Sequence, residues 1–276
     1  MGKRWQAGKK KTAITAAAGT FALAVVLASL VGVSPASAAD VVVVGRSPSE
    51  GKADGGPGVK GEPFSVNRFV LPDEAKVLVV VEGTEGSNCN VYVYEKTGQG
   101  WAKRLETAGI LGKNGMSNHR TAGDLTTPIG VFQMNTPFGQ SEAKEGFPPH
   151  YIQVTEEYVW TDDTNRLVED STQEGEHVGT AMYVGYYDYV LDSGYNRQGI
   201  YQKGSALFLH CQAPGATSSG GCVAIPKEQM EEVMRLYGTY GDGACYIAQA
   251  PQGTFHQIYH TYGVNNGLSP EGDFGV

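Results

Sequence analysis

The chain has 276 residues, with 21 Lys and Arg against 29 Asp and Glu. Five of the basic residues lie within the first 38 positions, so the remainder carries 16 basic and 29 acidic side chains, a net charge of −13. This charge excludes binding of nucleic acid through phosphate neutralisation, and adhesion to anionic membranes or wall polymers by charge alone. The 38 Gly and 15 Tyr, with many valines, predict a fold rich in strands and loops.

Residues 1–38 have the pattern of a secretory signal peptide. A basic start is followed by an apolar run at 13–33 and by the small-residue cleavage site Ala36-Ser37-Ala38. The alternative is an uncleaved membrane anchor, because the apolar run is long for a signal. No later apolar run is long enough to cross a bilayer. We therefore expect a secreted, extracytoplasmic protein with no stable membrane span after cleavage.

The mature chain is predicted to form one domain between two polar segments. Residues 39–63 are rich in Gly, Pro, Lys and Asp and predict a flexible lead-in, and residues 251–276 predict a polar C-terminal tail. The domain itself spans 64–250. Apolar or alternating runs predict strands at 76–83, 90–96, 101–105, 129–134, 206–210 and 244–250. Residues 136–180 carry few apolar runs and are interpreted as an insertion with short elements.

One helix is predicted, at 226–237. Pro226 suits its first turn, and Gly238 is the expected C-cap. Its buried face is formed by the residues at helical spacing, Met230, Val233, Met234 and Tyr237. The predicted fold class is therefore mainly β with one clear helix (α+β).

The four cysteines, Cys89, Cys211, Cys222 and Cys245, allow two disulfides in a secreted chain. Because Cys211 and Cys222 flank one small loop, we expect Cys222 to be free, which leaves one other cysteine free as well. Cys89 and Cys245 lie beside strand-like runs and are the expected disulfide pair.

The most informative segment is 207–226, where His210 ends an apolar run and Cys222 follows Ser219-Gly220-Gly221. A loop of small residues can bring the imidazole beside the thiol, and we expect His210 to generate the thiolate for nucleophilic catalysis. The glycines permit a tight turn and leave the N–H groups of Gly221 and Cys222 open to an oxyanion. Ser219 is expected to orient the loop or to donate to the substrate.

His210 has no obvious Asp or Asn partner in the sequence, so a backbone carbonyl, for example that of Cys211, is expected to orient its ring. Taken alone, a histidine at the end of a strand is as consistent with an inert core residue. No metal site is predicted: His256 and His260 are four residues apart but have no third ligand nearby. No cofactor is expected.

Two blocks of the chain resemble the L,D-transpeptidase catalytic domain family, also called YkuD or ErfK/YbiS/YcfS/YnhG. The first is Gly123-Asp124 followed by Thr127-Pro128-Ile129-Gly130-Val131-Phe132, and the second is Ser219-Gly220-Gly221-Cys222-Val223 after a strand that ends in histidine. The resemblance covers about residues 75–250. It implies an L,D-transpeptidase-like β-sandwich in the cell wall.

The resemblance also implies a reaction and roles for residues. Cys222 matches the nucleophile, His210 the proton acceptor and donor, and Gly221 with Cys222 the oxyanion region. The substrates are peptidoglycan stem peptides: the thiolate attacks the bond between positions three and four of a tetrapeptide stem, and an amine of another stem resolves the thioester into a 3→3 cross-link. Carbapenem-type inhibitors acylate the same cysteine.

The sequence departs from the family pattern beside the nucleophile. Gly220 and Ala224 stand where the family commonly has histidine and arginine, and the separation of His210 from Cys222 is shorter than in many members. The cationic residues that are candidates to replace this arginine are Lys113, Arg120 and Arg197. Arg120 is also a candidate for substrate binding. Tyr187, from the tyrosine-rich segment 181–201, is a second candidate for substrate binding. The alternative is that the tyrosines of this segment only pack within the fold.

Two other functions stay open from the sequence. Water in place of the amine gives an L,D-carboxypeptidase that releases the terminal D-residue by hydrolysis. A wall-binding module stapled by disulfides would have no catalysis at all.

Overall fold

The computed structural model describes residues 64–264, and the predicted signal peptide, the whole of the predicted lead-in and residues 265–276 of the predicted tail lie outside them. The fold is mainly β, as predicted, with one long helix, α1 (Lys227–Tyr240). Ten strands form the main sheet: β1 (Val77–Gly83), β2 (Asn88–Thr97), β3 (Gly100–Ile110), β6 (Gly130–Gln133), β7 (Asn135–Gly139), β8 (Ile152–Gln153), β12 (Val190–Asp192), β13 (Phe208–Cys211), β14 (Val223–Ile225) and β15 (Cys245–Pro251).

The remaining elements are short. They are the strands β4 (Met116–Ser117), β5 (Thr127–Pro128), β9 (Tyr158–Thr161), β10 (Leu167–Glu169) and β11 (Gly175–Glu176), the 3₁₀ turns η1 (Val66–Arg68), η2 (Ala181–Tyr183) and η3 (Phe255–Gln257), and α2 (Thr261–Val264). β10, β9 and β11 form a separate small sheet, and β4 pairs with β5. The segment 136–180 thus contains short elements, as expected of an insertion.

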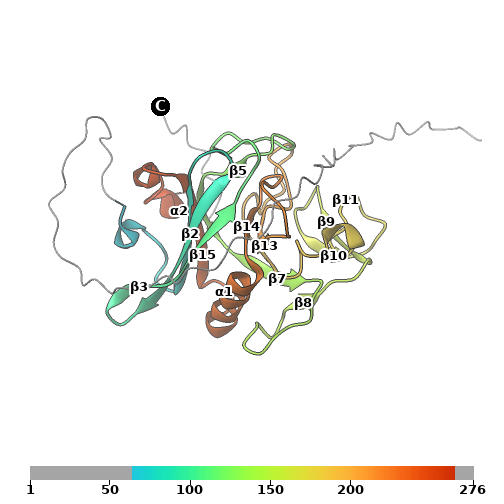
Figure 1. The fold of residues 1–276 in the computed structure, drawn as a ribbon, viewed down its shortest axis with the longest axis horizontal. Helices are drawn as coiled ribbons and strands as arrows, with labels where there is room; N and C mark the ends of the chain where they lie inside the picture. Colours follow the sequence, from blue (N-terminus) through green and yellow to red (C-terminus); the bar gives the residue numbers. More distant parts are fainter. Residues whose placement is uncertain (1–63, 265–276) are drawn as a thin grey trace, which may run out of the picture. The chain divides into compact units, whose positions relative to one another are not determined.

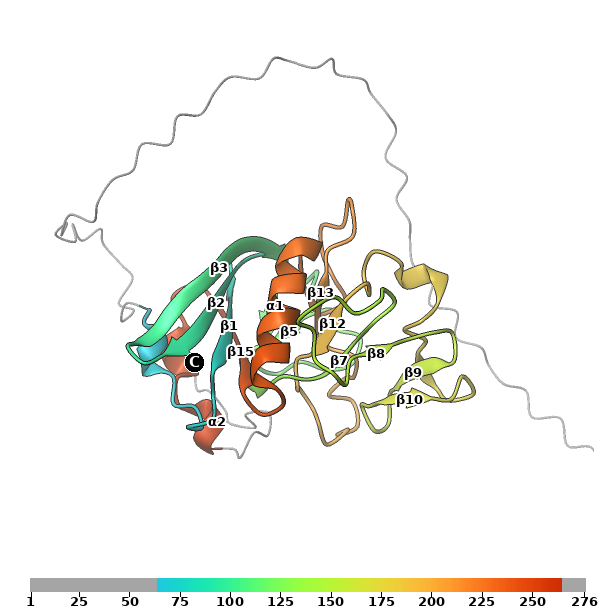
Figure 2. The same cartoon turned by 90° about the horizontal axis from the view of Figure 1, so that it is seen from below.

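The main sheet is continuous but bends in its middle. Its strand order is β6-β15-β1-β2-β3-β14-β13-β12-β7-β8, and β3 meets β14 through a single residue pair, Ile110 with Ala224. The two halves of the sheet lie on either side of α1 (Figures 1 and 2). The sandwich implied by the resemblance is therefore one curled sheet that closes over a helix.

The strands follow from their apolar patterns. β1 is a run of valine and leucine, and its side chains alternate between two clusters: Val77, Val79 and Val81 face the main core, whereas Leu78 and Val80 face a second cluster on the outer side. The central residues of β2 alternate between buried and partly buried, because one face of the strand is covered completely and the other only in part. β1 and β2 pair in antiparallel register and form a hairpin.

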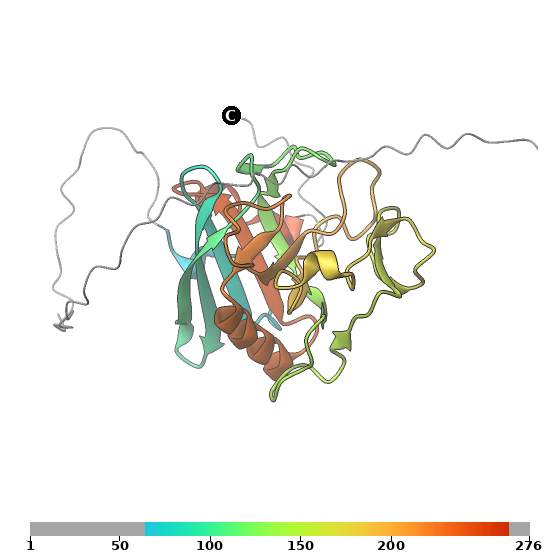
Figure 3. The ribbon, with the colours of Figure 1, turned by 45° about the vertical axis from the view of Figure 1, so that its right-hand side comes forward.

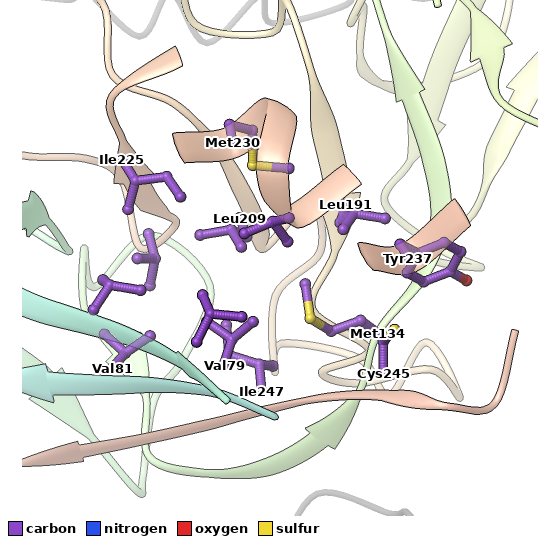
Figure 4. Packing of buried hydrophobic residues seen from close by; sticks show 14 of the residues in the cluster. Val79, Val81, Met134, Leu191, Leu209, Ile225, Met230, Tyr237, Cys245 and Ile247 are labelled. Carbon is purple, nitrogen blue, oxygen red and sulfur yellow. The ribbon is translucent and has the colours of Figure 1, made fainter. Parts of the chain in front are cut away.

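The helix presents the predicted apolar face to the main core. Met230, Val233, Met234 and Tyr237 are all buried, and Met230 and Tyr237 pack over residues from β13 and β15 (Figure 4). The predicted C-cap is wrong, because the helix continues past Gly238 and ends at Gly241, whose φ is 77°. Gly238 serves a close approach instead, since a Cβ there would lie 2.1 Å from the carbonyl oxygen of Gly146.

The start of the predicted polar tail is also corrected. Residues 251–264 cross the outer face of the sheet in η3 and α2, where Phe255, Ile258 and Tyr259 are buried against β1 and β15. Short 3₁₀ turns have no long period by which they are recognised in a sequence. The folded domain therefore includes the segment up to at least Tyr262.

The predicted disulfide between Cys89 and Cys245 does not form. Cys89 pairs with Gly83 at one end of β1, and Cys245 pairs with Val77 at the other, so roughly 20 Å of strand separates them. All four cysteines are free and buried. Within residues 64–264 there is no helix of the length and apolar character that a membrane crossing requires.

Candidate active site

His210 lies in β13, and Cys222 directly precedes the neighbouring strand β14, near the middle of the sheet. β13 and β14 are parallel and pair Leu209 with Val223 and His210 with Ala224. Leu209 and Val223 point into the main core, so Phe208, His210 and Cys222 share the opposite face, which the segment 138–190 covers. Figure 3 shows these orange strands between the teal half of the sheet and the yellow segment.

The thiol of Cys222 is bonded to backbone groups of the chain that leads to His210. Its sulfur accepts a hydrogen bond from the N–H of Phe208 and donates one to the carbonyl of Ala206, each at 3.3 Å. Ala206 has a φ of 53°, which a residue with a Cβ seldom adopts. The loop thus brings thiol and imidazole to one face, as expected, but within the described residues no hydrogen bond joins them.

A buried network fixes the backbone at Ala206. The side-chain oxygen of Asn165 accepts from the indole N–H of Trp160 at 2.6 Å and from the N–H of Ala206 at 3.1 Å. The side-chain amide of Asn165 donates to the carbonyls of Tyr195 and Asn196, both at 2.9 Å. Each polar atom of the Asn165 side chain therefore has a hydrogen-bond partner. The network holds Ala206 in its strained conformation, with its carbonyl directed at the thiol of Cys222.

The imidazole of His210 is oriented as predicted. Its Nδ1 lies 2.8 Å from the carbonyl oxygen of Cys211, so Nδ1 carries the proton, and the backbone of Tyr186 is a second hydrogen-bond partner of the ring. Burial lowers the pKa of His210 to about 4, so the ring is neutral at neutral pH. An oriented, neutral imidazole is the form that acts as a general base.

Burial in the resting site disfavours the thiolate that we expected His210 to generate. Burial raises the pKa of Cys222 to about 12; the charge of Glu176 adds to this rise, and Arg120 opposes it. Since burial disfavours both the anion and the imidazolium, the pair rests as neutral thiol and neutral imidazole. The proton must therefore leave the thiol as the sulfur attacks, rather than beforehand.

The turn before the nucleophile requires one of its two glycines. Gly221 has a φ of 138°, and a Cβ there would lie 2.8 Å from the carbonyl oxygen of Thr126. A Cβ on Gly220 would meet nothing within 4 Å. The hydroxyl of Thr127 donates to the carbonyl of Gly221 and accepts from the N–H of Gly112, each at 2.8 Å. The two sequence blocks singled out above therefore meet at Gly221.

Ser219 holds the loop, which is one of the two roles expected for it. Its hydroxyl donates to the carbonyl of Cys222 at 2.6 Å and accepts from the N–H of Gly221 at 3.1 Å. That second bond occupies a group we expected to face an oxyanion. Among residues 64–264 no acceptor engages the N–H of Cys222, which is therefore the open donor beside the sulfur.

Arg120 is the cation that lies at the nucleophile loop. It is 4% exposed, its guanidinium lies over the ring of Tyr195, and its Nη2 is 3.6 Å from a carboxylate oxygen of Asp124. A Cβ on Gly221 would be 3.6 Å from the same Nη2. Within the described part of the chain, Nε and Nη1 have no hydrogen-bond partner. Buried donors of this kind are costly unless an anion or water satisfies them.

The other two cationic candidates lie elsewhere. Lys113 has an exposed side chain and contributes only its backbone N–H, which donates to the carbonyl of Ser219. Arg197 donates to the side chain of Gln133 and lines a cavity of about 380 Å³ beside His150 and Asp242. That cavity borders neither the thiol nor the imidazole.

Tyr187 belongs to the site, but not as the wall of an open groove. Its ring is buried and lies 5.3 Å from the His210 ring and 5.7 Å from that of Phe208. Its hydroxyl donates to the carboxylate of Glu176, and its ring stacks on Tyr183 at 4.5 Å and an interplanar angle of 9°. The tyrosine supports the imidazole from one side.

Glu176 is the residue that the sequence did not reveal. It accepts hydrogen bonds from both Tyr183 and Tyr187, and burial raises its pKa to about 7. It lies in the segment without apolar periodicity, and a single Gly-Glu pair there gives no signal by which it could have been found. Among residues 64–264, no group of three or more His, Cys, Asp or Glu side chains is placed to hold a metal ion.

Comparison with known proteins adds little to this geometry. No family model and no curated protein matches the chain. Among solved structures, that of Bdellovibrio bacteriovorus Bd1075 matches 63% of this chain at 16% identity with a TM-score of 0.35. The match spans 47% of that chain, about half of its length. The site must be interpreted from its own residues.

Proposed function

We propose that the chain is a cysteine-dependent L,D-transpeptidase of the family it resembles, secreted to the cell wall and acting on tetrapeptide stems of peptidoglycan. The observation that carries this proposal is the convergence of Thr127 and the Cys222 loop at Gly221. Two sequence blocks 94 residues apart, each weak alone, form one structure around a free thiol that shares a face with an oriented imidazole.

The first half-reaction makes an acyl-enzyme. Nε2 of His210 takes the thiol proton as Sγ of Cys222 attacks the carbonyl carbon between stem positions three and four. The N–H of Cys222 stabilises the oxyanion. The imidazolium returns the proton to the departing amine of the D-residue, the C–N bond breaks and a thioester remains. For this step the thiol must release its hydrogen bond to Ala206.

Arg120 is proposed to hold the donor. Its Nε and Nη1, which have no protein partners among the described residues, suit a carboxylate, and a tetrapeptide stem ends in one. Nη2 of the same guanidinium lies at the Gly221 turn. This assignment gives the chain a substitute for the arginine that Ala224 replaces. A carbapenem, which also carries a carboxylate, is expected to acylate the same thiol.

The second half-reaction distinguishes two products. An amine of a second stem gives a 3→3 cross-link or exchange of the terminal residue, whereas water gives a tripeptide stem and makes the protein an L,D-carboxypeptidase. The wall-binding alternative depended on disulfides, and the four free thiols remove that support.

The test is to incubate the mature protein with a tetrapeptide-stem muropeptide and to analyse the products by mass spectrometry. Loss of the terminal D-residue together with dimers supports transpeptidation, and tripeptide monomers alone support the carboxypeptidase. Arg120→Lys should raise KM for the donor by about tenfold, since a point charge replaces a two-pronged donor. No thioester and no product would contradict the proposal.

A further inference from the structure

Glu176 is connected to the nucleophile through aromatic side chains. Its carboxylate accepts from Tyr187, whose ring faces the His210 imidazole at 5.3 Å. Tyr183 donates to the same carboxylate and stacks on Tyr187. Glu176 as a whole is partly exposed, whereas its carboxylate lies against the two tyrosines.

This carboxylate does not assist the first half-reaction. A negative charge near the sulfur raises the pKa of Cys222 after burial has already done so, and it disfavours any anion formed there. The two tyrosines nevertheless hold it firmly in place. A fixed negative charge beside a nucleophile is useful only toward a positively charged partner, and the acceptor of a transpeptidation carries an ammonium group at neutral pH.

We propose that Glu176 binds the ammonium group of the acceptor and removes its proton, so that the site selects primary alkylamines over water in the second half-reaction. The inference rests on the proposed function. The carboxylate takes one proton from R–NH₃⁺, and the freed nitrogen attacks the thioester carbon. The C–S bond breaks as the C–N bond forms, and the second proton of the nitrogen passes through His210 to the departing sulfur, which restores the thiol.

The surrounding groups suit this role. Burial raises the pKa of Glu176 to about 7, while the hydrogen bonds from Tyr187 and Tyr183 oppose that rise and the charge of Asp162 adds to it. Burial and the charge of Glu176 also raise the pKa of both phenols, so they stay protonated donors. A carboxyl group that titrates near neutral pH can both accept the ammonium proton and lose it again in each cycle.

The experiment compares the fates of one acyl-enzyme. Wild type and Glu176→Gln are first acylated with a tetrapeptide donor. Each acyl-enzyme is then divided between two acceptors. One is an amino acid amide, which is an ammonium ion at neutral pH, and the other is hydroxylamine, which is uncharged there. The ratio of aminolysis to hydrolysis is measured for each. In Glu176→Gln this ratio should fall roughly a hundredfold for the ammonium acceptor and change less than about twofold for hydroxylamine.

Controls separate the proposed role from damage to the fold. Glu174→Gln, an exposed neighbour, should leave both ratios unchanged, and Tyr183→Phe should lower only the ratio for the ammonium acceptor, by a smaller factor. If Glu176→Gln does not fold, the ratio of aminolysis to hydrolysis in Tyr183→Phe tests the inference in its place. An unchanged ratio for the ammonium acceptor, or an equal fall for both acceptors, overturns the inference and leaves the proposed function intact. A wild-type protein that forms no acyl-enzyme contradicts the proposed function instead.

Discussion

Two buried thiols on opposite faces of the same pair of strands show what separates a core cysteine from a candidate nucleophile. Cys211 points into the main core and contacts the carbonyl of Tyr189 at 3.7 Å. Cys222 points to the other face, in a cluster with Tyr187 and within reach of the charge of Glu176, and His210 is on the adjacent strand. Burial raises the pKa of each to about 12, so depth does not distinguish them. The two thiols differ instead in their neighbouring groups that can accept or donate a proton.

The largest difference should appear when each thiol is removed. Cys222→Ala should abolish acyl-enzyme formation and lower the free energy of unfolding by about 1–2 kcal/mol, because the sulfur is buried and bonds the backbone of Phe208 and Ala206. Cys211→Ala should keep acylation and lower the free energy of unfolding by about 1–2 kcal/mol, because it leaves a cavity in the core. Thioester formation by intact mass and thermal unfolding measure the two effects. Acylation lost in Cys211→Ala but kept in Cys222→Ala would reverse the assignment.

The two glycines before the nucleophile offer a second comparison. Gly221→Ala should slow acylation by about a hundredfold or more, because the strained Cβ displaces the N–H of Cys222, and should cost about 1–3 kcal/mol of stability. Gly220→Ala, in open space, should change stability by less than about 0.5 kcal/mol. Single-turnover acylation and chemical denaturation test the pair, and equal effects of the two substitutions would argue against the geometry of the turn.

The two half-reactions should respond differently to pH. The base form of His210 exists above its pKa of about 4, so acylation should be flat around neutrality and fall about tenfold per unit only below that value. The carboxylate form of Glu176 is lost as pH falls through about 7, so the ratio of aminolysis to hydrolysis should fall there. Rates and product ratios from pH 4 to 8, with circular dichroism as the check on folding, test this. An acylation rate that falls with pH near the ordinary pKa of histidine would contradict the buried, neutral imidazole.

The smallest effect is expected at Ser219. Ser219→Ala removes two hydrogen bonds that hold the loop but leaves the turn unstrained, so it should cost about 1 kcal/mol of stability and slow acylation about tenfold. The neighbouring Ser218→Ala is the matched control and should change neither quantity. A loss as large as that of Gly221→Ala would mean that the hydroxyl contacts the substrate, the other role expected from the sequence.

The parts of the fold that were predicted from the sequence have a strong local period. β1 and β2 follow apolar runs and alternation, and α1 follows its buried face. The helix boundary was wrong because a glycine at a close contact and a glycine at a C-cap look alike in a sequence. The packed segment after β15 was missed because Phe255, Ile258 and Tyr259 are interspersed with polar residues in turns.

The site divides in the same way. His210, Cys222 and the carbonyl that orients the imidazole lie close together in the chain, and local reasoning reached them. Arg120, which the sequence offered as one of three cationic candidates, and Glu176, which it did not reveal, come from 102 and 46 residues before Cys222. They are brought to it by pairing across the sheet and by the segment that covers it. Their burial, and hence their orphaned donors and raised pKa, depends on contacts that no local pattern encodes.

The central claim is that Cys222 is a free thiol that accepts an acyl group. The most direct measurement is the intact mass of the mature protein after incubation with a carbapenem under non-reducing conditions, followed by proteolysis to locate the modification. One adduct per chain on the peptide that contains Cys222 is the predicted result. No adduct, an adduct on Cys89, Cys211 or Cys245, or Cys222 found in a disulfide would contradict it.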